Sequence, residues 1–173
     1  MLFRSKSRTI NAIIGKDVCS VGHVGNTTRD AHWVPFHLSK SSQPDFFLLD
    51  LPGWGVSKRI DNEYKDILSK SIPQADAVLW IIRADALGTL AYDIQWIEKI
   101  VLPSLDGNVS KLVVGVNQIE NIHDRIFNNG KPSKTLVDTL NKKCSLIHEE
   151  ISYSVCDFKA DNIQPYSAAL SHR

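Results

Sequence analysis

The sequence predicts an α/β fold built on a largely parallel β-sheet. Three observations support this: extended and helical patterns alternate along the chain, the strongest strand candidates are continuous apolar runs, and the segments between them are amphipathic. Continuous apolar runs indicate strands that are buried on both faces, with helices covering the sheet. In sheets of this type, ligands bind beyond the carboxyl ends of the strands.

The first part of the chain predicts a short helix followed by two strands. Ser7–Ile14 is the helix, and Gly15 after it suits a left-handed C-cap. Val34–Leu38 alternates in the manner of a half-exposed strand, which Pro35 confines to a sheet edge. Phe46–Asp50 is a buried-strand run that ends in a carboxylate.

The rest of the chain predicts alternating helices and strands. Apolar residues that recur every three or four positions indicate the helices, and short apolar runs indicate the strands. In chain order the elements are a helix that Asp61 caps and Pro73 terminates, a strand at Ala77–Ile82, a helix at Leu90–Val101, a strand at Leu112–Val116, a long helix at Leu136–Ile151 with Ser133 near its start, and a weak strand at Ile163–Tyr166.

Length and composition favour a single cytoplasmic domain over residues 1–173 and leave the oligomeric state open. The 20 Lys and Arg residues against 19 Asp and Glu residues exclude a strongly basic nucleic-acid coat. The three widely spaced cysteines exclude a disulfide scaffold or a zinc ribbon and favour a reducing compartment. The longest apolar run, Ala77–Ile82, is too short for a transmembrane segment.

Polar groups follow three of the predicted strands, at the positions where a ligand would bind. Asp50 can hold Mg²⁺ through water, and the backbone N–H of Gly53 is open to a phosphate. Glu120, in the segment Asn117–Glu120, can accept hydrogen bonds from the N1–H and N2–H₂ edge of guanine, an edge that adenine does not offer. Ser167-Ala168 follows the last strand. Each segment alone is also ordinary turn chemistry, but all three occur in order after buried strands.

Two further segments complete a series of five motifs. Lys6-Ser7 followed by Ile10–Ile13 is similar to the end of a phosphate loop and its helix, G-K-S-x-x-x-N-A-L, and Gly25–Asp30 (Gly-Asn-Thr-Thr-Arg-Asp) is similar to a first switch. The segments after the strands match a DxxG motif, an approximate NKxD and a final S-A motif. The series resembles the Era/TrmE-like small GTPases, which are translation-factor-related P-loop GTPases of the 50S ribosome-binding type. The resemblance spans nearly the whole chain.

The resemblance implies a P-loop GTPase-like three-layer sandwich with a mostly parallel central sheet. It implies hydrolysis of GTP to GDP and phosphate with Mg²⁺, as a molecular switch, and it alone suggests the ribosome or RNA as a partner. The nucleotide-binding residues that it implies are Ser5, Lys6, Ser7, Arg8, Thr27, Gly53, Asn117, Gln118, Glu120, Ser167 and Ala168. The implied catalytic residues are Lys6 and Thr28, and the implied Mg²⁺ ligands are Ser7, Thr28 (or Thr27) and Asp50.

The phosphate-loop motif departs from the family pattern. Ser5 stands where the loop G-x-x-x-x-G-K-[ST] has its second glycine, and the first glycine would lie before Met1. The strand that leads into this loop is also missing, so the sequence predicts a GTPase domain truncated at its N-terminus. Loop amides that wrap a phosphate need conformations that glycine reaches cheaply, and a side chain there costs on the order of 1 kcal/mol.

Two other departures concern base recognition and hydrolysis. Gln118 and Glu120 replace the family's Lys and Asp, and the longer Glu side chain shifts the carboxylate. Trp54 follows Gly53, where many GTPases place a water-orienting Gln, and an indole N–H cannot accept a proton from water. We therefore expect slow or absent hydrolysis. A degenerate, non-enzymatic remnant with weak or no nucleotide binding is the alternative, and an ATP-binding P-loop protein is disfavoured by the base-reading segments.

Overall fold

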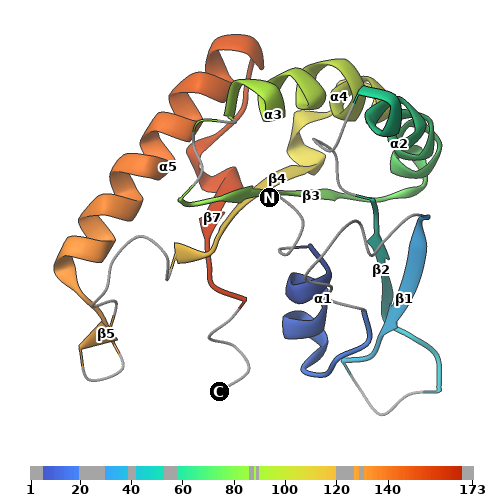
Figure 1. Ribbon diagram of the computed structural model, residues 1–173, viewed down its shortest axis with the longest axis horizontal. Helices are drawn as coiled ribbons and strands as arrows, with labels where there is room; N and C mark the ends of the chain where they lie inside the picture. Colours follow the sequence, from blue (N-terminus) through green and yellow to red (C-terminus); the bar gives the residue numbers. More distant parts are fainter. Residues whose placement is uncertain are drawn as a thin grey trace. The chain divides into compact units, whose positions relative to one another are not determined.

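The computed structural model describes residues 6–19, 30–38, 42–52, 58–85, 88, 90–119, 127–128 and 131–168 (Figure 1). The chain divides into two compact units, Met1–Ser71 with Ala168–Arg173, and Ile72–Ser167. The strands within these residues form sheets with the orders β1-β2, β3-β4-β7 and β5-β6. The predicted α/β class is confirmed.

The first unit contains α1 (Lys6–Ile14), β1 (His32–Phe36), β2 (Phe46–Asp50) and α2 (Lys58–Ser71). The two strands are antiparallel, and α1 packs against β2. Buried residues from the helix, the segment after it and β1 form a small core, which comprises Ile10, Cys19 and Val34 with the half-buried Ile14 and Leu48.

Gly15 ends α1 in the way that the sequence predicts. Its φ of 75° lies in the left-handed region, and its N–H donates to the carbonyl of Asn11 at 2.8 Å. The chain can therefore turn back along α1 directly after the helix.

The second unit is built on a parallel sheet that consists of β3 (Val78–Arg83), β4 (Leu112–Asn117) and β7 (Ile163–Pro165). Val114 and Val116 in the central strand are fully buried, as a strand paired on both sides requires. A short 3₁₀ helix, η1 (Ile72–Gln74), precedes β3, and two further 3₁₀ turns, η4 (Val109–Lys111) and η6 (Ala160–Asn162), precede β4 and β7.

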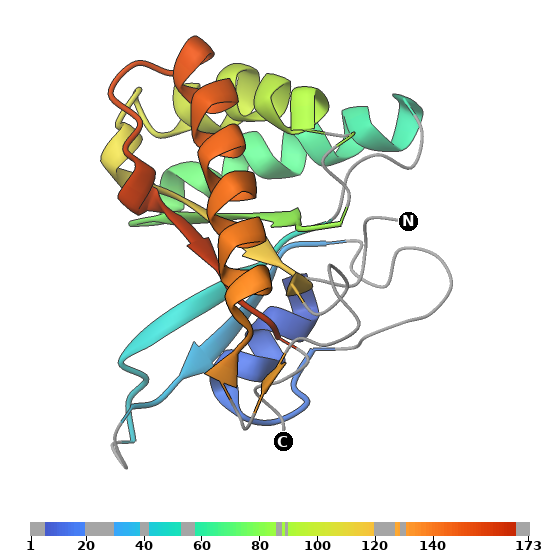
Figure 2. The ribbon, with the colours of Figure 1, turned by 90° about the vertical axis from the view of Figure 1, so that its left-hand side faces the viewer.

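The helices of this unit are α3 (Leu90–Trp96), α4 (Leu102–Ser104) and α5 (Lys134–Ser154) (Figures 1 and 2). α3 packs against α5, and α5 packs against β7. Trp80 on β3 donates its indole N–H to Asp93 on α3 at 3.1 Å, and both side chains are buried. This hydrogen bond ties the sheet to the helix layer.

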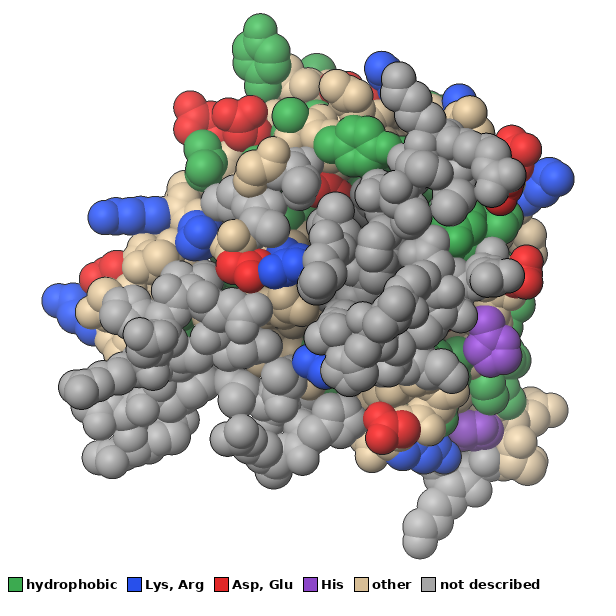
Figure 3. All heavy atoms as spheres, in the orientation of Figure 1, with side chains coloured by type: hydrophobic (Ala, Val, Ile, Leu, Met, Phe, Trp, Pro, Cys, Tyr) green, Lys and Arg blue, Asp and Glu red, His purple; other side chains and the backbone are tan. Residues whose placement is uncertain are grey.

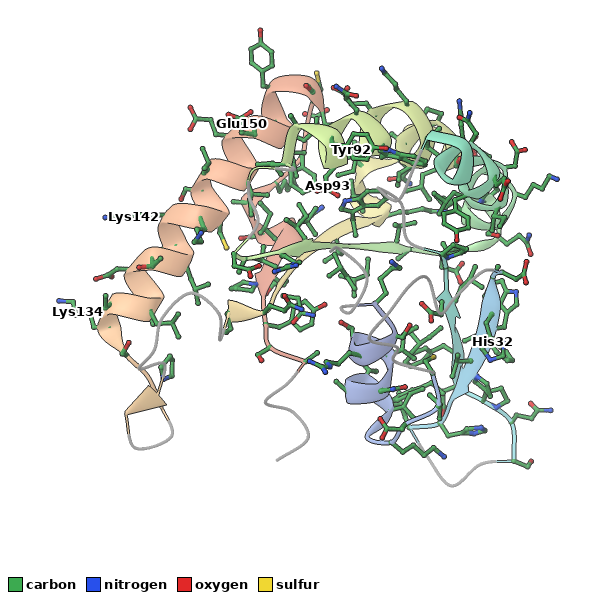
Figure 4. All side chains as sticks on the ribbon, viewed as in Figure 1. His32, Tyr92, Asp93, Lys134, Lys142 and Glu150 are labelled. Atoms are coloured by element: carbon green, nitrogen blue, oxygen red, sulfur yellow. The ribbon has the colours of Figure 1, made fainter. Side chains whose placement is uncertain are left out.

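The long helix α5 matches its prediction closely. The Ser133 Oγ accepts the N–H of Leu136 at 3.2 Å and so caps the helix. The predicted apolar stripe faces inward, with Leu136, Leu140, Ile147 and Ile151 buried and Cys144 half-buried. The charged side chains labelled on α5 in Figure 4, Lys134, Lys142 and Glu150, point away from the sheet.

The predicted helix at Leu90–Val101 contains a π-helical segment, η3 (Ile97–Val101), between α3 and α4. The N–H of Leu102 donates to the carbonyl of Ile97, five residues earlier. Pro103 explains the wider turn, because its ring lacks an N–H and would collide with the carbonyl of Lys99 in a regular α-helix.

Several predictions require correction. β2 is not a buried strand: Phe46 and Phe47 are 40% and 53% exposed. Among the described residues, β2 pairs with β1 alone, and the small core lies on one face of that hairpin. α2 begins at Lys58, so Asp61 lies inside it and is not its cap. β1 ends at Phe36, and Leu38 is exposed. The short hairpin β5 (Phe127–Asn128) and β6 (Lys131–Pro132) was not predicted.

On the face shown in Figure 3, the acidic and basic side chains of the described residues are interspersed. This distribution agrees with the formal net charge of +1. Within the described part of the chain, no helix combines the length and the apolar character that a membrane span requires.

Candidate functional site

Two residues of the predicted phosphate and Mg²⁺ site are in direct contact. The Oγ of Ser7, in the first turn of α1, donates to the Oδ2 of Asp50 at the end of β2, at a distance of 2.7 Å. The two residues are 43 positions apart in the sequence, and both side chains are buried. The fold of the first unit therefore brings the phosphate-loop motif and the DxxG motif together.

The chemistry of this pair suits Mg²⁺. A carboxylate and a hydroxyl are hard oxygen donors, and Mg²⁺ is commonly held by one or two such groups while it keeps several of its waters. Lys6 is the first residue of α1 and precedes Ser7, so the chain carries a positive charge next to this pair in the sequence. Arg8 follows on the same turn and is half-buried. Ser7 and Asp50 thus fit the ion that the resemblance implies.

Asn11 orders the segment that follows α1, a role that the sequence did not predict. The Oδ1 of Asn11 accepts the N–H groups of Val18 and Cys19 at 3.0 and 2.8 Å, and its Nδ2 donates to the Cys19 carbonyl at 2.9 Å. The sequence shows Asn11 only as one letter of the phosphate-loop motif.

The surroundings of Cys19 suppress ionisation of its thiol. Burial and the negative charge of Asp50 raise the pKa of the Cys19 thiol from 9.0 to about 11. The thiol is therefore protonated at neutral pH. It is not an activated nucleophile.

The predicted base-reading segment begins at the carboxyl end of β4. Asn117 is 1% exposed, and its Oδ1 accepts the N–H of Gln118 at 2.7 Å. The Asn117 carbonyl accepts the N–H of Ala84, which follows β3, at 2.8 Å. Gln118 has a φ of 62°, in the left-handed region that non-glycine residues rarely adopt. Asn117 thus fixes the direction in which the chain leaves the sheet.

The last motif follows β7, beside β4. The N–H of Tyr166 donates to the carbonyl of Val116 at 2.9 Å, which continues the pairing of the two strands by one residue. Ser167 is half-buried, and Ala168 is 1% exposed. Asn117 and the chain that leads into Ser167 therefore leave the same edge of one parallel sheet, as the sequence predicts.

The remaining predicted site residues lie outside the described part of the chain. These are Ser5, Thr27, Thr28, Gly53 and Glu120, together with Trp54. Among the described residues, no group of three or more His, Cys, Asp or Glu side chains is arranged to hold a metal ion. Of the oxygen ligands predicted for Mg²⁺, the structure describes Ser7 and Asp50.

The sequence profile of the 50S ribosome-binding GTPase family matches residues 6–142. That range includes four of the five motifs described above, and it covers well over half of the chain. Two curated proteins of Escherichia coli K12, both uncharacterized, are also similar. YkfA is 36% identical over 80 residues and YfjP is 35% identical over 81 residues, which in each case is 46% of this chain and 27% of the relative.

Solved structures of Era share the fold. One is Era in complex with MgGDPNP and nucleotides 1506–1542 of 16S ribosomal RNA, with a TM-score of 0.66. The other is a variant of Era from Aquifex aeolicus bound to GDP and aluminium fluoride, with a TM-score of 0.67. Both are 21% identical to this chain, and the match covers 96% of this chain and 48% of the Era chain. The chain thus spans about half of the Era chains and about a quarter of the curated relatives.

Proposed function

The chain belongs to the 50S ribosome-binding GTPase family, and we propose that it binds GTP and GDP with Mg²⁺ and acts as a GTP-hydrolysing molecular switch. Family membership and the Era-like fold support the binding of guanine nucleotide. The observation that carries the proposal is the hydrogen bond of 2.7 Å between Ser7 and Asp50, because these residues are the hydroxyl and carboxylate expected at the ion.

We assign the roles on the phosphate side as follows. The Lys6 ammonium neutralises the β- and γ-phosphates, and Arg8 is a second cation close to it. Ser7 and either Thr27 or Thr28 offer oxygens to the ion, Asp50 holds it through water, and the Gly53 N–H senses the γ-phosphate. When bound, Mg²⁺ neutralises charge that develops on the phosphate oxygens.

On the base side, we assign recognition of guanine to Glu120, with Asn117 and the Ser167-Ala168 segment framing the ring. Gln118 takes the position of the family's lysine. A carboxylate can accept from both N1–H and N2–H₂ of guanine, whereas adenine lacks this pair of donors. A site built to hydrogen-bond such a group rejects an analogue that lacks it, because buried polar groups would be left unpaired.

Calorimetry with GDP and ADP tests the proposal. We expect GDP to bind the full chain at least about tenfold more tightly than ADP, and we expect Glu120→Ala to remove most of this preference. Glu150→Ala is the matched control, because Glu150 lies on the outward side of α5 and should leave the preference intact. Equal affinities for the two nucleotides would contradict the base assignment. No binding of either would identify the chain as a non-binding remnant.

We also propose the ribosome, through its RNA, as the partner of the whole protein, and the cytoplasm as its location. The description of the family and the Era complex with 16S ribosomal RNA support the partner. The three cysteines are free thiols, which suits a reducing compartment. Co-sedimentation with ribosomal subunits, in the presence of GDP or of a non-hydrolysable GTP analogue, tests the partner. If the protein is absent from the ribosomal pellet with either nucleotide, the ribosome is not its partner.

A further inference from the structure

The residue that enters the last motif lies beside the first residue of the base-reading motif. β7 pairs with β4 in the register Val116↔Pro165, and the N–H of Tyr166 donates to the carbonyl of Val116 at 2.9 Å. The residues that follow this pair, Asn117 and Tyr166, are therefore neighbours at the carboxyl edge of the parallel sheet. The position of Tyr166 sets the point at which Ser167 leaves the sheet.

The ring of Tyr166 extends away from this edge, back over β4. Its Cε1 lies 2.8 Å from the point that a Cβ at Gly115 would occupy, two residues before Asn117. The Cδ1 of Leu79 on β3 lies 3.2 Å from the same point, so the two side chains approach Gly115 from the two sides of β4. The half-buried ring therefore packs on the sheet and is not directed at a ligand beyond the carboxyl edge.

The contact with Tyr166 accounts for Gly115. The backbone of Gly115 is not in the left-handed region, so its conformation does not require glycine. A glycine inside a strand weakens it, because it loses more entropy on folding and has no side chain to pack. The compensating gain here is room for the Tyr166 ring, which anchors the chain as it leaves β7.

We propose that Tyr166, seated over Gly115, is a positioning residue that holds the Ser167-Ala168 segment in place for recognition of guanine. This inference rests on the proposed function, in which that segment frames the base. Residues of a binding site recognise a ligand well only when supporting groups lock them in the productive geometry. The competing explanation is that the ring only covers apolar surface of β4.

Four variants separate positioning from packing. Tyr166→Phe keeps the ring, Tyr166→Leu removes it, Gly115→Ala displaces it, and the double variant Gly115→Ala/Tyr166→Leu gives the added methyl group room. Tyr153→Leu is the matched control, because Tyr153 on α5 is 94% exposed. Melting temperatures establish that each variant is folded. Gly115→Ala keeps the test valid if removal of the ring prevents folding.

Calorimetry on the full chain measures the affinity for GDP with and without Mg²⁺. We expect Tyr166→Leu and Gly115→Ala each to weaken GDP binding about tenfold, and Tyr166→Phe and Tyr153→Leu to bind as the wild type does. The double variant should bind no more weakly than Tyr166→Leu alone, because the added methyl group then meets no ring. The fold by which Mg²⁺ strengthens GDP binding should be the same in all variants, because the ion belongs to the phosphate side of the nucleotide.

The outcomes are distinct. If Tyr166→Leu lowers the melting temperature but binds GDP as the wild type does, the ring is a packing group and the inference is wrong. It is also wrong if Tyr166→Phe binds as weakly as Tyr166→Leu, or if the effect of Mg²⁺ is lost together with the affinity. If the wild type itself binds no guanine nucleotide, the proposed function fails and this inference fails with it. A wild type that binds GDP restricts any failure to the role of Tyr166.

Discussion

The ring of Tyr166 occupies the space that a side chain at Gly115 would fill. A Cβ at Gly115 would lie 2.8 Å from the Cε1 of Tyr166 and 3.2 Å from the Cδ1 of Leu79. Gly115 is in the middle of β4, and Tyr166 immediately precedes the Ser167-Ala168 segment. Because Gly115 has no side chain, the ring of Tyr166 can lie against β4 directly before the Ser167-Ala168 segment.

We predict that Gly115→Ala destabilises the protein by about 1–3 kcal/mol, the usual cost of forcing extra volume into a packed site. Tyr166 would have to move, and the chain that it anchors would move with it. Urea unfolding measures the free energy, and Gly88→Ala is the control, because no atom of the described residues lies within 4 Å of a Cβ added there. Equal stability of the two variants would show that the ring shifts freely.

The left-handed backbone of Gln118 gives a second prediction. A φ of 62° costs an L-residue roughly 1–2 kcal/mol, and glycine avoids this cost but loses more backbone entropy on folding. We expect Gln118→Gly to raise the free energy of unfolding by about 0.5 kcal/mol relative to Gln118→Ala, which shares the strain. Thermal melts of both variants measure this difference. A glycine variant that is no more stable than the alanine variant would contradict the prediction.

Most of the second unit was predictable because the preferences of its residues for helix or strand agree with the way those elements pack. Val114 and Val116 belong to an apolar run that could only be a buried strand, and Ser133 is a residue that caps helices. The apolar run of β2 was misleading, because its sequence does not show that β1 is the one strand beside it in the described part of the chain. The π-helical turn before Pro103 depends on the clash that the proline ring would make with the carbonyl of Lys99. The spacing of apolar residues does not detect such a clash.

The site was predictable to the extent that its residues stand in motifs. Ser7 and Asp50 were both predicted, and their contact follows from the order of the motifs in the fold. The role of Asn11 was not predictable, because an asparagine in a helix carries no signal of what it touches. One clue was present: a buried polar residue next to Ile10 must satisfy its hydrogen bonds within the protein.

The three thiols should differ in reactivity. Thiolate is the reactive form, and the pKa of Cys19 is raised to about 11, while burial also raises the pKa of Cys144. Cys156 is exposed. With iodoacetamide at pH 8, we expect Cys156 to react first, Cys144 more slowly and Cys19 last, as measured by mass spectrometry of digests. Early modification of Cys19 in the folded protein would contradict its burial beside Asp50.

The same raised pKa predicts a loss of stability at high pH. The unfolded chain releases the Cys19 proton near its ordinary pKa of 9.0, before the folded protein does. The contribution of Cys19 is therefore complete below pH 9 and is lost as the pH rises toward about 11. We expect the wild type to lose more stability than Cys19→Ser across this range, as measured by urea unfolding at several pH values. If the stabilities of the two proteins fall in parallel as the pH rises, the Cys19 thiol makes no contribution to the pH dependence of folding.

Hydrolysis of GTP should be slow and should depend on Asp50. The residue after the DxxG motif is Trp54, which cannot accept a proton from the attacking water, so we expect turnover well below the roughly 1–100 per second of efficient phosphoryl-transfer enzymes. The remaining activity should require Mg²⁺ and fall further in Asp50→Ala, while Asp157→Ala, beyond the end of α5, should leave it unchanged. Phosphate release at saturating GTP, with and without EDTA, is the measurement. Fast turnover would show that the loop around Ser5 and Lys6 needs no glycine, and turnover that survives Asp50→Ala would remove that carboxylate from the mechanism. The second result would break the link between the hydrogen bond of Ser7 to Asp50 and the chemistry assigned to it.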